Sequence, residues 1–277
     1  MSVLVTEIEA ASALTQTGGF LYSFTHTLNP YGGCAFGCPY CYVRQGVAAR
    51  LEKVPWGRYV KPKVNVAERL EEELRGAQQR GMLSALRIFM SSVTDPYQPE
   101  ERRRCLTRRC LESLARHPPQ VLVLQTRSPL VVRDRDVLRD LHACLWVSMT
   151  VETDDEAVRR AVTPACPPIA NRLDAMQALL EDGLRVQAAL SPILPHHPEA
   201  LAQAIEPRCT RALVDTFVSG DGSGGKRTER NCISALYESL GYGDWRNEEA
   251  ARGLYGVLRE RLGADRVVWS CDGFNSV

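Results

Sequence analysis

Six short apolar runs, separated by segments of helical periodicity, constrain the fold of this chain more than any other feature of its sequence. The runs are rich in β-branched and aromatic residues, which is typical of strands, and amphipathic stretches follow them. The expected strands are residues 20–28, 86–91, 120–126, 145–151, 184–190 and 212–218, with a further short run at 266–270. The expected helices are residues 65–81, 99–117, 133–143, 169–183, 228–240 and 248–262.

Strands that alternate with helices predict parallel βαβ units with right-handed crossovers. Runs such as VLVLQT and LWVSMTV are apolar on both faces, as a sheet covered by helices requires. Six units are too few for the closed eight-stranded barrel, so the sequence predicts an α/β fold, a partial (β/α)6 TIM-type barrel with parallel strands. We expect one domain over residues 1–277, with a core at about 20–220 and a C-terminal helical extension at about 221–277. A functional site is expected at the C-terminal ends of the strands.

Ten cysteines occur in 277 residues that carry a formal net charge of +1. The chain shows no secretory signal and no apolar run long enough to span a membrane, so we expect free or metal-bound thiols in a cytoplasmic protein. The balanced charge gives no general argument for a nucleic-acid or membrane partner.

Three of the cysteines are grouped in the segment NPYGGCAFGCPYCYVRQ, where Cys34, Cys38 and Cys41 have the spacing C-x3-C-x2-C. Compact groups of this kind usually bind metal. A structural zinc ion needs four protein ligands, so it would have to recruit a distant fourth residue. An iron–sulfur cubane held by three thiolates keeps one iron open to an exogenous ligand, so the odd number of thiols favours a reactive cluster.

The motif, with Tyr40 directly before the third cysteine, resembles the radical S-adenosylmethionine (SAM) superfamily. Further segments occur in the order seen in proteins similar to spore photoproduct lyase, over roughly residues 20 to 220: SSVTDPYQPEE, LVLQTRSPLVVRD, LWVSMTVETDDE and RLDAMQALLEDGLRVQAALSPILP. The resemblance implies a partial (β/α)6 barrel and a [4Fe-4S] cluster on Cys34, Cys38 and Cys41. It also implies that S-adenosylmethionine binds the fourth iron and is cleaved to a 5'-deoxyadenosyl radical, which abstracts hydrogen from a substrate.

The resemblance also implies cofactor contacts at the ends of the following strands. Ser92, Thr94 and Asp95 offer hydroxyls and a carboxylate to the methionine and ribose parts, although Thr94 or Asp95 would equally cap the next helix. Arg127 stands where the lyase has a basic residue near the cofactor carboxylate, and the alternative is a surface arginine. Ser148 matches a serine that reaches the cofactor, and a structural hydroxyl in the sheet is the alternative. Ile193 would form an apolar wall for the adenine, or pack in the core.

One position departs from the lyase pattern. The lyase keeps a cysteine near the end of the second strand that returns a hydrogen atom to the product, whereas this chain has Ser92 or a neighbouring residue without a thiol. A serine O–H bond is too strong for that step, which puts repair of thymine dimers by the same route in doubt. Cys166, in the proline-rich turn after the fourth strand, is a candidate replacement near the barrel mouth; the alternative is an ordinary buried cysteine.

A glycine-rich segment, residues 219–231, follows the sixth strand. Its amides and Lys226 would suit a phosphate, but it lacks the P-loop pattern, and a mobile lid is the alternative. The basic run at 102–109 is best explained as the solvated face of a helix.

Two classes of function remain open. The first is a radical SAM enzyme supplied by an electron donor such as flavodoxin or ferredoxin, acting on a nucleic acid or nucleotide, or else on a peptide or small metabolite. The second is a non-catalytic iron–sulfur or zinc protein.

Overall fold

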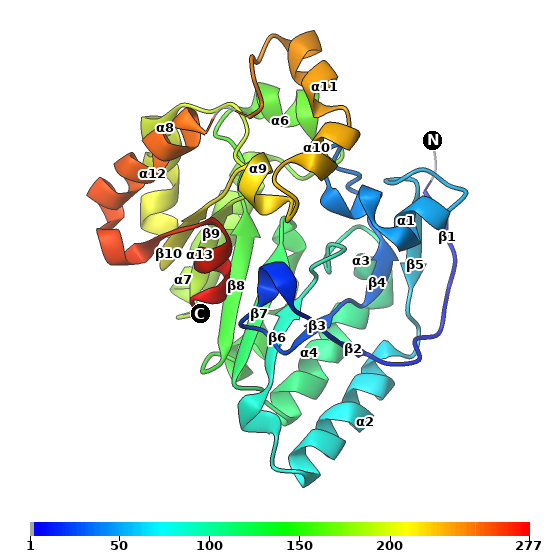
Figure 1. Ribbon diagram of the computed structural model, residues 1–277. Helices are drawn as coiled ribbons and strands as arrows, with labels where there is room; N and C mark the ends of the chain where they lie inside the picture. The colour runs from blue at the N-terminus through cyan, green and yellow to red at the C-terminus, as the bar shows by residue number, and fades with distance from the viewer. Residues whose placement is uncertain (1–2, 247) are drawn as a thin grey trace.

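The computed structural model describes residues 3–246 and 248–277. Seven parallel strands and one antiparallel edge strand form the main sheet, in the order β11-β10-β9-β8-β7-β6-β3-β2 (Figure 1). The strands are β2 Leu14–Gln16, β3 His26–Leu28, β6 Arg87–Met90, β7 Val121–Thr126, β8 Leu145–Thr150, β9 Val186–Leu190, β10 Arg211–Val214 and β11 Val267–Trp269. The edge strands β2 and β11 do not pair with each other, so the predicted α/β fold is confirmed as an open barrel.

A second, three-stranded sheet lies beside the barrel and was not predicted. It has the order β1-β5-β4, with β1 Leu4–Val5, β4 Tyr31–Gly33 and β5 Tyr59–Pro62. Strand β4 pairs antiparallel with β5 and ends directly before Cys34. The small sheet therefore supports the start of the cysteine segment.

Helices cover the sheet and extend beyond its carboxyl end. Helix α2 packs on α4, and α8 packs on α12 (Figure 1). The helices are α1 Val47–Leu51, α2 Val66–Gln79, α3 Glu101–Arg104, α4 Leu106–Arg116, α5 Arg135–Asp140, α6 Glu156–Val162, α7 Ile169–Glu181, α8 Pro198–Ile205, α9 Phe217–Gly220, α10 Lys226–Arg230, α11 Ile233–Leu240, α12 Glu249–Leu262 and α13 Ser270–Asn275. Within the described ranges, no helix combines the length and the apolar character needed to cross a bilayer.

Four of the expected elements differ from those observed. The strand expected at 212–218 ends at Val214 as β10, and Phe217 begins helix α9. The first strand is confirmed only at β3, because Gly19 turns the chain at φ +63° and Phe20 then lies in a 3-10 turn, η1 Gly19–Leu21. The expected helix 99–117 is broken at Cys105, where a left-handed φ of +52° separates α3 from α4. Cys232 (φ +58°) likewise separates α10 from α11.

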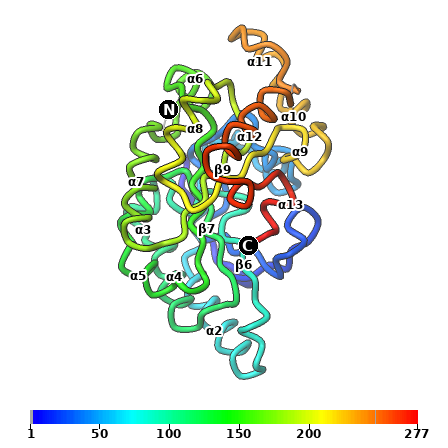
Figure 2. Tube along the Cα trace, turned by 90° about the vertical axis from the view of Figure 1, so that its left-hand side faces the viewer, coloured from blue at the N-terminus to red at the C-terminus, as the bar shows by residue number. Residues whose placement is uncertain are grey.

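The C-terminal segment fills the gap between the two edge strands. The expected helical extension also supplies β11, which pairs in parallel with β10. Helix α13 then lies beside the N-terminal segment, as Figure 2 shows. Asn275 Nδ2 donates to Phe20 O at 2.8 Å, and the rings of Phe20 and Phe274 meet edge to face at 5.4 Å. The barrel is therefore closed on this side by side chains rather than by a strand.

Candidate functional site

The three clustered cysteines lie on one loop and line one cavity. The loop begins where β4 ends, at the carboxyl end of the barrel, and the cavity of about 540 Å³ has Cys34, Cys38 and Cys41 in its wall. Burial raises the pKa of Cys34 to about 12 and also raises that of Cys41, so these thiols hold their protons at neutral pH. Binding of a metal cluster would therefore release protons.

Glycines allow the cysteine loop to fold tightly. Gly37 has a φ of +58°, and a Cβ there would lie 2.8 Å from the Cα of Gly57. Gly33 has a φ of +70°, and a Cβ there would lie 2.5 Å from the carbonyl oxygen of Tyr59. A side chain at either position would push the loop away from its support. The three thiols and the tight fold of the loop that carries them fit a cluster held by three thiolates.

Two residues after β6 fasten the same loop. Thr94 Oγ1 donates to Gly33 O at 2.6 Å, and Gln98 Oε1 accepts from Ala35 N at 2.9 Å. Gln98 Nε2 in turn donates to Thr94 Oγ1 at 3.2 Å. Thr94, expected as a cofactor contact, thus also anchors the loop, while Gln98 was missed because a lone glutamine carries no sequence signal.

Ser92, Thr94 and Asp95 all line the cavity, as expected of cofactor contacts. The carboxylate of Asp95 is already used by the protein: Oδ1 accepts from Thr126 Oγ1 at 2.8 Å and from Tyr97 N at 2.9 Å, and Oδ2 accepts from Arg127 N at 2.9 Å. Asp95 therefore joins the ends of β6 and β7. It does not cap a helix, since α3 begins only at Glu101.

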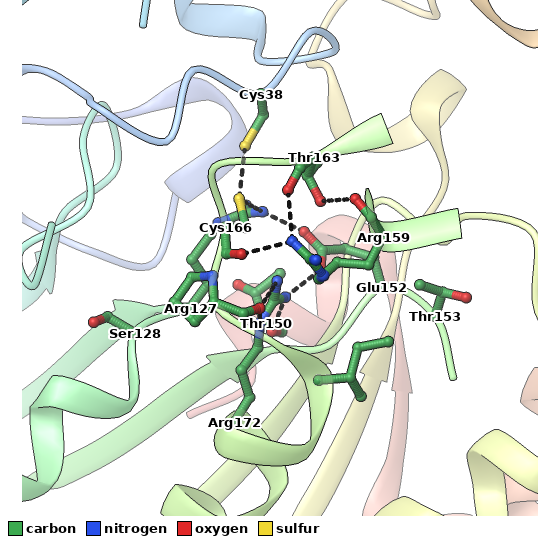
Figure 3. Close-up of polar contacts among 12 residues, drawn as sticks. Cys38, Arg127, Ser128, Thr150, Glu152, Thr153, Arg159, Thr163, Cys166 and Arg172 are labelled. Atoms are coloured by element: carbon green, nitrogen blue, oxygen red, sulfur yellow. Dashed lines mark hydrogen bonds and ion pairs between the residues drawn. The ribbon is translucent and has the colours of Figure 1, made fainter. Parts of the chain in front are cut away.

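Arg127 belongs to a buried ionic network behind the cysteine loop (Figure 3). Its Nη1 contacts Glu152 Oε1 and donates to Tyr40 Oη at 3.1 Å, and Tyr40 Oη donates to the same Glu152 oxygen at 2.6 Å. The other oxygen of Glu152 accepts from Arg172 Nη1 at 2.7 Å. Arg127 lines the cavity, so it is not the surface arginine of the alternative interpretation.

The side chain of Glu152 connects its own segment to three others that are remote in sequence, those of Tyr40, Arg127 and Arg172. Its side chain is 1% exposed and that of Arg172 is 0% exposed. Burial alone would raise the pKa of Glu152, but the guanidinium groups of Arg127 and Arg172 outweigh burial and lower that pKa to about 2. A carboxylate two residues after a largely buried strand was the one available signal for it, since a buried charge must find a partner.

Cys166 lies behind the cysteine loop and is not among the residues that line the cavity (Figure 3). It is 3% exposed; its Sγ lies 3.8 Å from Cys38 Sγ and 3.6 Å from Arg127 Nη1. The turn that carries it is fixed by Arg159, whose Nη1 donates to Cys166 O at 2.8 Å. The expected mouth-facing position is therefore wrong, because Arg159 and Arg127 hold this turn against the loop.

Ser148 and Ile193 also lie outside the cavity lining. Ser148 is fully buried, and its Oγ accepts from Gln187 Nε2 at 2.8 Å inside the barrel. Thr150, two residues further along β8, lines the cavity instead. Ile193 packs in the main core, while Ser191 and Pro192 before it line the cavity.

The glycine-rich segment 219–231 is folded around a carboxylate of its own. Asp221 is 5% exposed, and its two oxygens accept hydrogen bonds from the backbone amides of Ser223, Gly225, Arg227 and Thr228 at 2.7–3.1 Å. The hydroxyls of Ser223 and Thr228 donate to them as well. The position that a phosphate would take is thus filled by Asp221, which argues against the phosphate cradle.

Comparison with known proteins gives a family and a fold. The model of the Radical SAM superfamily matches residues 28–206, more than half of the chain. An uncharacterized protein of Methanocaldococcus jannaschii is 30% identical over 171 residues, which is 61% of each chain. An uncharacterized protein of the Acidianus two-tailed virus is 31% identical over 170 residues, 59% of this chain and 54% of its own. The matches thus span between half and about three fifths of these relatives.

Among solved structures, spore photoproduct lyase complexed with dinucleoside spore photoproduct has a TM-score of 0.65. That alignment covers 96% of this chain and 81% of the lyase chain at 12% sequence identity. A lyase mutant with bound AdoMet and dinucleoside spore photoproduct gives a TM-score of 0.64, also at 12% identity. These similarities show a shared fold.

Proposed function

Since the chain belongs to the radical SAM superfamily, and is thus an enzyme that uses a [4Fe-4S] cluster and S-adenosylmethionine, we propose that it acts on a nucleic acid or nucleotide by hydrogen abstraction. The cluster and cofactor together supply a 5'-deoxyadenosyl radical when the cluster is reduced. The substrate class is the part of the proposal that goes beyond the family.

One observation carries the proposal of a reaction centre: the thiols of Cys34, Cys38 and Cys41 share a single cavity with polar residues from the ends of four parallel strands. Those residues are Ser92, Thr126, Thr150 and Ser191. Ligand sites at the carboxyl ends of parallel strands are the general pattern in barrel folds. A non-catalytic cluster protein has no need of such a cavity beside its cysteines.

The residues of this chain divide the work between binding and positioning. Cys34, Cys38 and Cys41 would hold the cluster, and we assign cofactor contacts to Ser92 and Arg127 because both line the same cavity. We assign to Thr150 and Ser191 the contacts that the sequence suggested for Ser148 and Ile193, because they line the cavity and Ser148 and Ile193 do not. Tyr40 and Glu152 position Arg127 through their hydrogen bonds to it.

A nucleic acid or nucleotide is favoured as substrate by the fold shared with spore photoproduct lyase, a protein solved with a dinucleoside product in place. The reaction should nevertheless end differently from that of the lyase, because none of the cavity residues that directly follow β6, residues 91–95, carries a thiol. Cys166 was one candidate for the closing hydrogen atom, the alternative being an ordinary buried cysteine, and this role would require its turn to move, since Cys166 is not among the residues that line the cavity. A peptide or small metabolite is the competing substrate class.

The test is anaerobic reconstitution with iron and sulfide, followed by reduction and addition of S-adenosylmethionine. We expect a reduced-cluster EPR spectrum that changes when the cofactor is added, with formation of 5'-deoxyadenosine. A variant with Cys34, Cys38 and Cys41 all changed to alanine is the matched control and should give neither signal. A cluster that does not respond to the cofactor would overturn the proposal in favour of a non-catalytic iron–sulfur protein. Oligonucleotides, peptides and small metabolites are then compared by their stimulation of turnover.

A further inference from the structure

Helix α1 presents an uncovered apolar face close to the cysteine loop. Val47 and Leu51 are 75% and 78% exposed, the highest values among the large apolar side chains of the described residues. They are four residues apart, so they lie on the same side of the helix. Together the two side chains form a small exposed apolar patch on α1.

The segment around this face is strongly basic. Residues 44–63 contain six cationic residues, Arg44, Arg50, Lys53, Arg58, Lys61 and Lys63, and one anionic residue, Glu52. The segment therefore carries +5, while the whole chain carries only +1. Lys61 pairs with Glu52, whereas Arg50 and Lys53 are exposed and form no ion pair with any described residue. We call Val47, Arg50, Leu51 and Lys53 the α1 patch.

The α1 patch is connected to the cluster-binding loop by a short and well-fastened piece of chain. The 3-10 turn η2 Tyr42–Gln45 follows Cys41 directly and packs on α1. Arg44 Nη1 donates to Pro39 O at 2.6 Å, and Asn231 Nδ2 donates to Cys41 O at 3.0 Å. Cys41 and Val47 are six positions apart in the sequence, so their Cα atoms lie within about 20 Å even for a fully extended chain. The 3-10 turn shortens that path.

We propose that the α1 patch is the docking surface for an acidic electron-donor protein that reduces the cluster. This rests on the proposed function, since only a redox-active cluster needs a donor. One electron leaves the reduced donor and enters the oxidised cluster, and no atom is transferred. Electron-transfer complexes are small and transient, and electrostatic steering raises their association rates. A pair of aliphatic side chains flanked by Arg50 and Lys53 supplies both a contact and a charge of the required sign.

A nucleic acid is the other anionic partner that a basic surface attracts. The aliphatic centre of the α1 patch argues against it, because phosphates are bound by cationic and hydrogen-bonding groups. Val47 and Leu51 offer neither. The patch is also better suited to a protein because burying its two aliphatic side chains is favourable only against an apolar partner surface.

The test compares reduction of the reconstituted protein by a reduced acidic plant-type ferredoxin with reduction by dithionite. Two double variants are needed: Arg50→Glu with Lys53→Glu, and Val47→Ser with Leu51→Ser. We expect the rate of reduction by ferredoxin at low salt to fall about tenfold or more in the charge-reversed variant. The serine variant should bind oxidised ferredoxin more weakly in calorimetry. Reduction by dithionite should stay unchanged in both.

Arg80→Glu with Met82→Ser is the matched control, since both residues are exposed at the far end of α2 (Figure 1). It should leave both rates unchanged. Equal ferredoxin rates and equal binding in all variants would overturn the proposal. Loss of binding to a labelled oligonucleotide, with unchanged ferredoxin rates, would also overturn it and assign the patch to nucleic acid. Failure of the proposed function is a separate result, because it would appear as absence of 5'-deoxyadenosine with dithionite in the wild-type protein.

Discussion

Replacing Glu152 by glutamine should destabilise the protein strongly, because Glu152 is the shared anion of two buried arginines. Its pKa falls from 4.5 to about 2 through Arg127 and Arg172, against the opposing effect of burial. At about 1.4 kcal/mol for each pKa unit, that lowering corresponds to about 3 kcal/mol of stability at neutral pH. This agrees with the roughly 3–5 kcal/mol lost when a buried ion pair loses one partner. Glutamine has a similar shape and still accepts the Tyr40 hydrogen bond, so the change removes mainly the charge.

The measurement is urea unfolding of the cluster-free protein, followed by circular dichroism. Because the folded-state pKa of Glu152 is lowered, its contribution is complete above about pH 4.5 and is lost as the pH falls towards 2. The difference between Glu152→Gln and wild type should therefore be about 3 kcal/mol at pH 7 and should shrink below pH 4.5. Glu199→Gln is the control, since that side chain is 73% exposed and its pair with Arg261 should be worth under about 1 kcal/mol. A Glu152→Gln variant within about 1 kcal/mol of wild type at pH 7 would refute the reasoning.

Three further predictions concern the loops around the cavity. Gly37→Ala should bind less than about half the iron of wild type on reconstitution, because its Cβ would meet Gly57 and its φ is positive. Gly18→Ala is the control and should bind iron normally, since a Cβ at Gly18 would have no atom within 4 Å. Equal iron contents in the two variants would contradict the account. Asp221→Asn should be cleaved faster within residues 219–231 in limited proteolysis, since an amide has one oxygen to accept the backbone hydrogen bonds where the carboxylate has two. An unchanged cleavage rate would count against a loop folded around the Asp221 carboxylate. Burial raises the pKa of Asp215 from 3.8 to about 6, so the contribution of this group is complete below about pH 3.8 and is lost as the pH rises through 6. In urea unfolding, Asp215→Asn should therefore gain stability relative to wild type as the pH rises from about 3.8 to about 6, and a difference that stays constant over this range would argue against the reasoning.

The cysteine loop and the parallel arrangement of the main strands could be predicted from the sequence because both depend on neighbours along the chain. Cys34, Cys38 and Cys41 are close in sequence, and their spacing alone limits the ligand chemistry. Strands such as β7 and β8 are apolar on both faces and are followed by helical patterns, so their parallel arrangement follows from local periodicity.

Only the tertiary structure decided how close each strand residue lies to the cavity. Ser148 and Thr150 share a face of β8, yet only Thr150 reaches the cavity, because depth depends on where the strand stops relative to its neighbours. Left-handed turns at Cys105 and Cys232 were equally invisible, since residues other than glycine adopt that conformation only when surrounding contacts impose it.

The sequence by itself determined the fold class and the grouping of three thiols on one short segment, since these follow from spacing and periodicity. Only the tertiary structure brought Tyr40, Arg127, Glu152 and Arg172 together and turned Cys166 towards Cys38. It also folded the glycine-rich segment around the carboxylate of Asp221. Each of these contacts pairs a buried charge or polar group with a partner, and the free energy that selects the partner depends on burial, which exists only once the chain has folded.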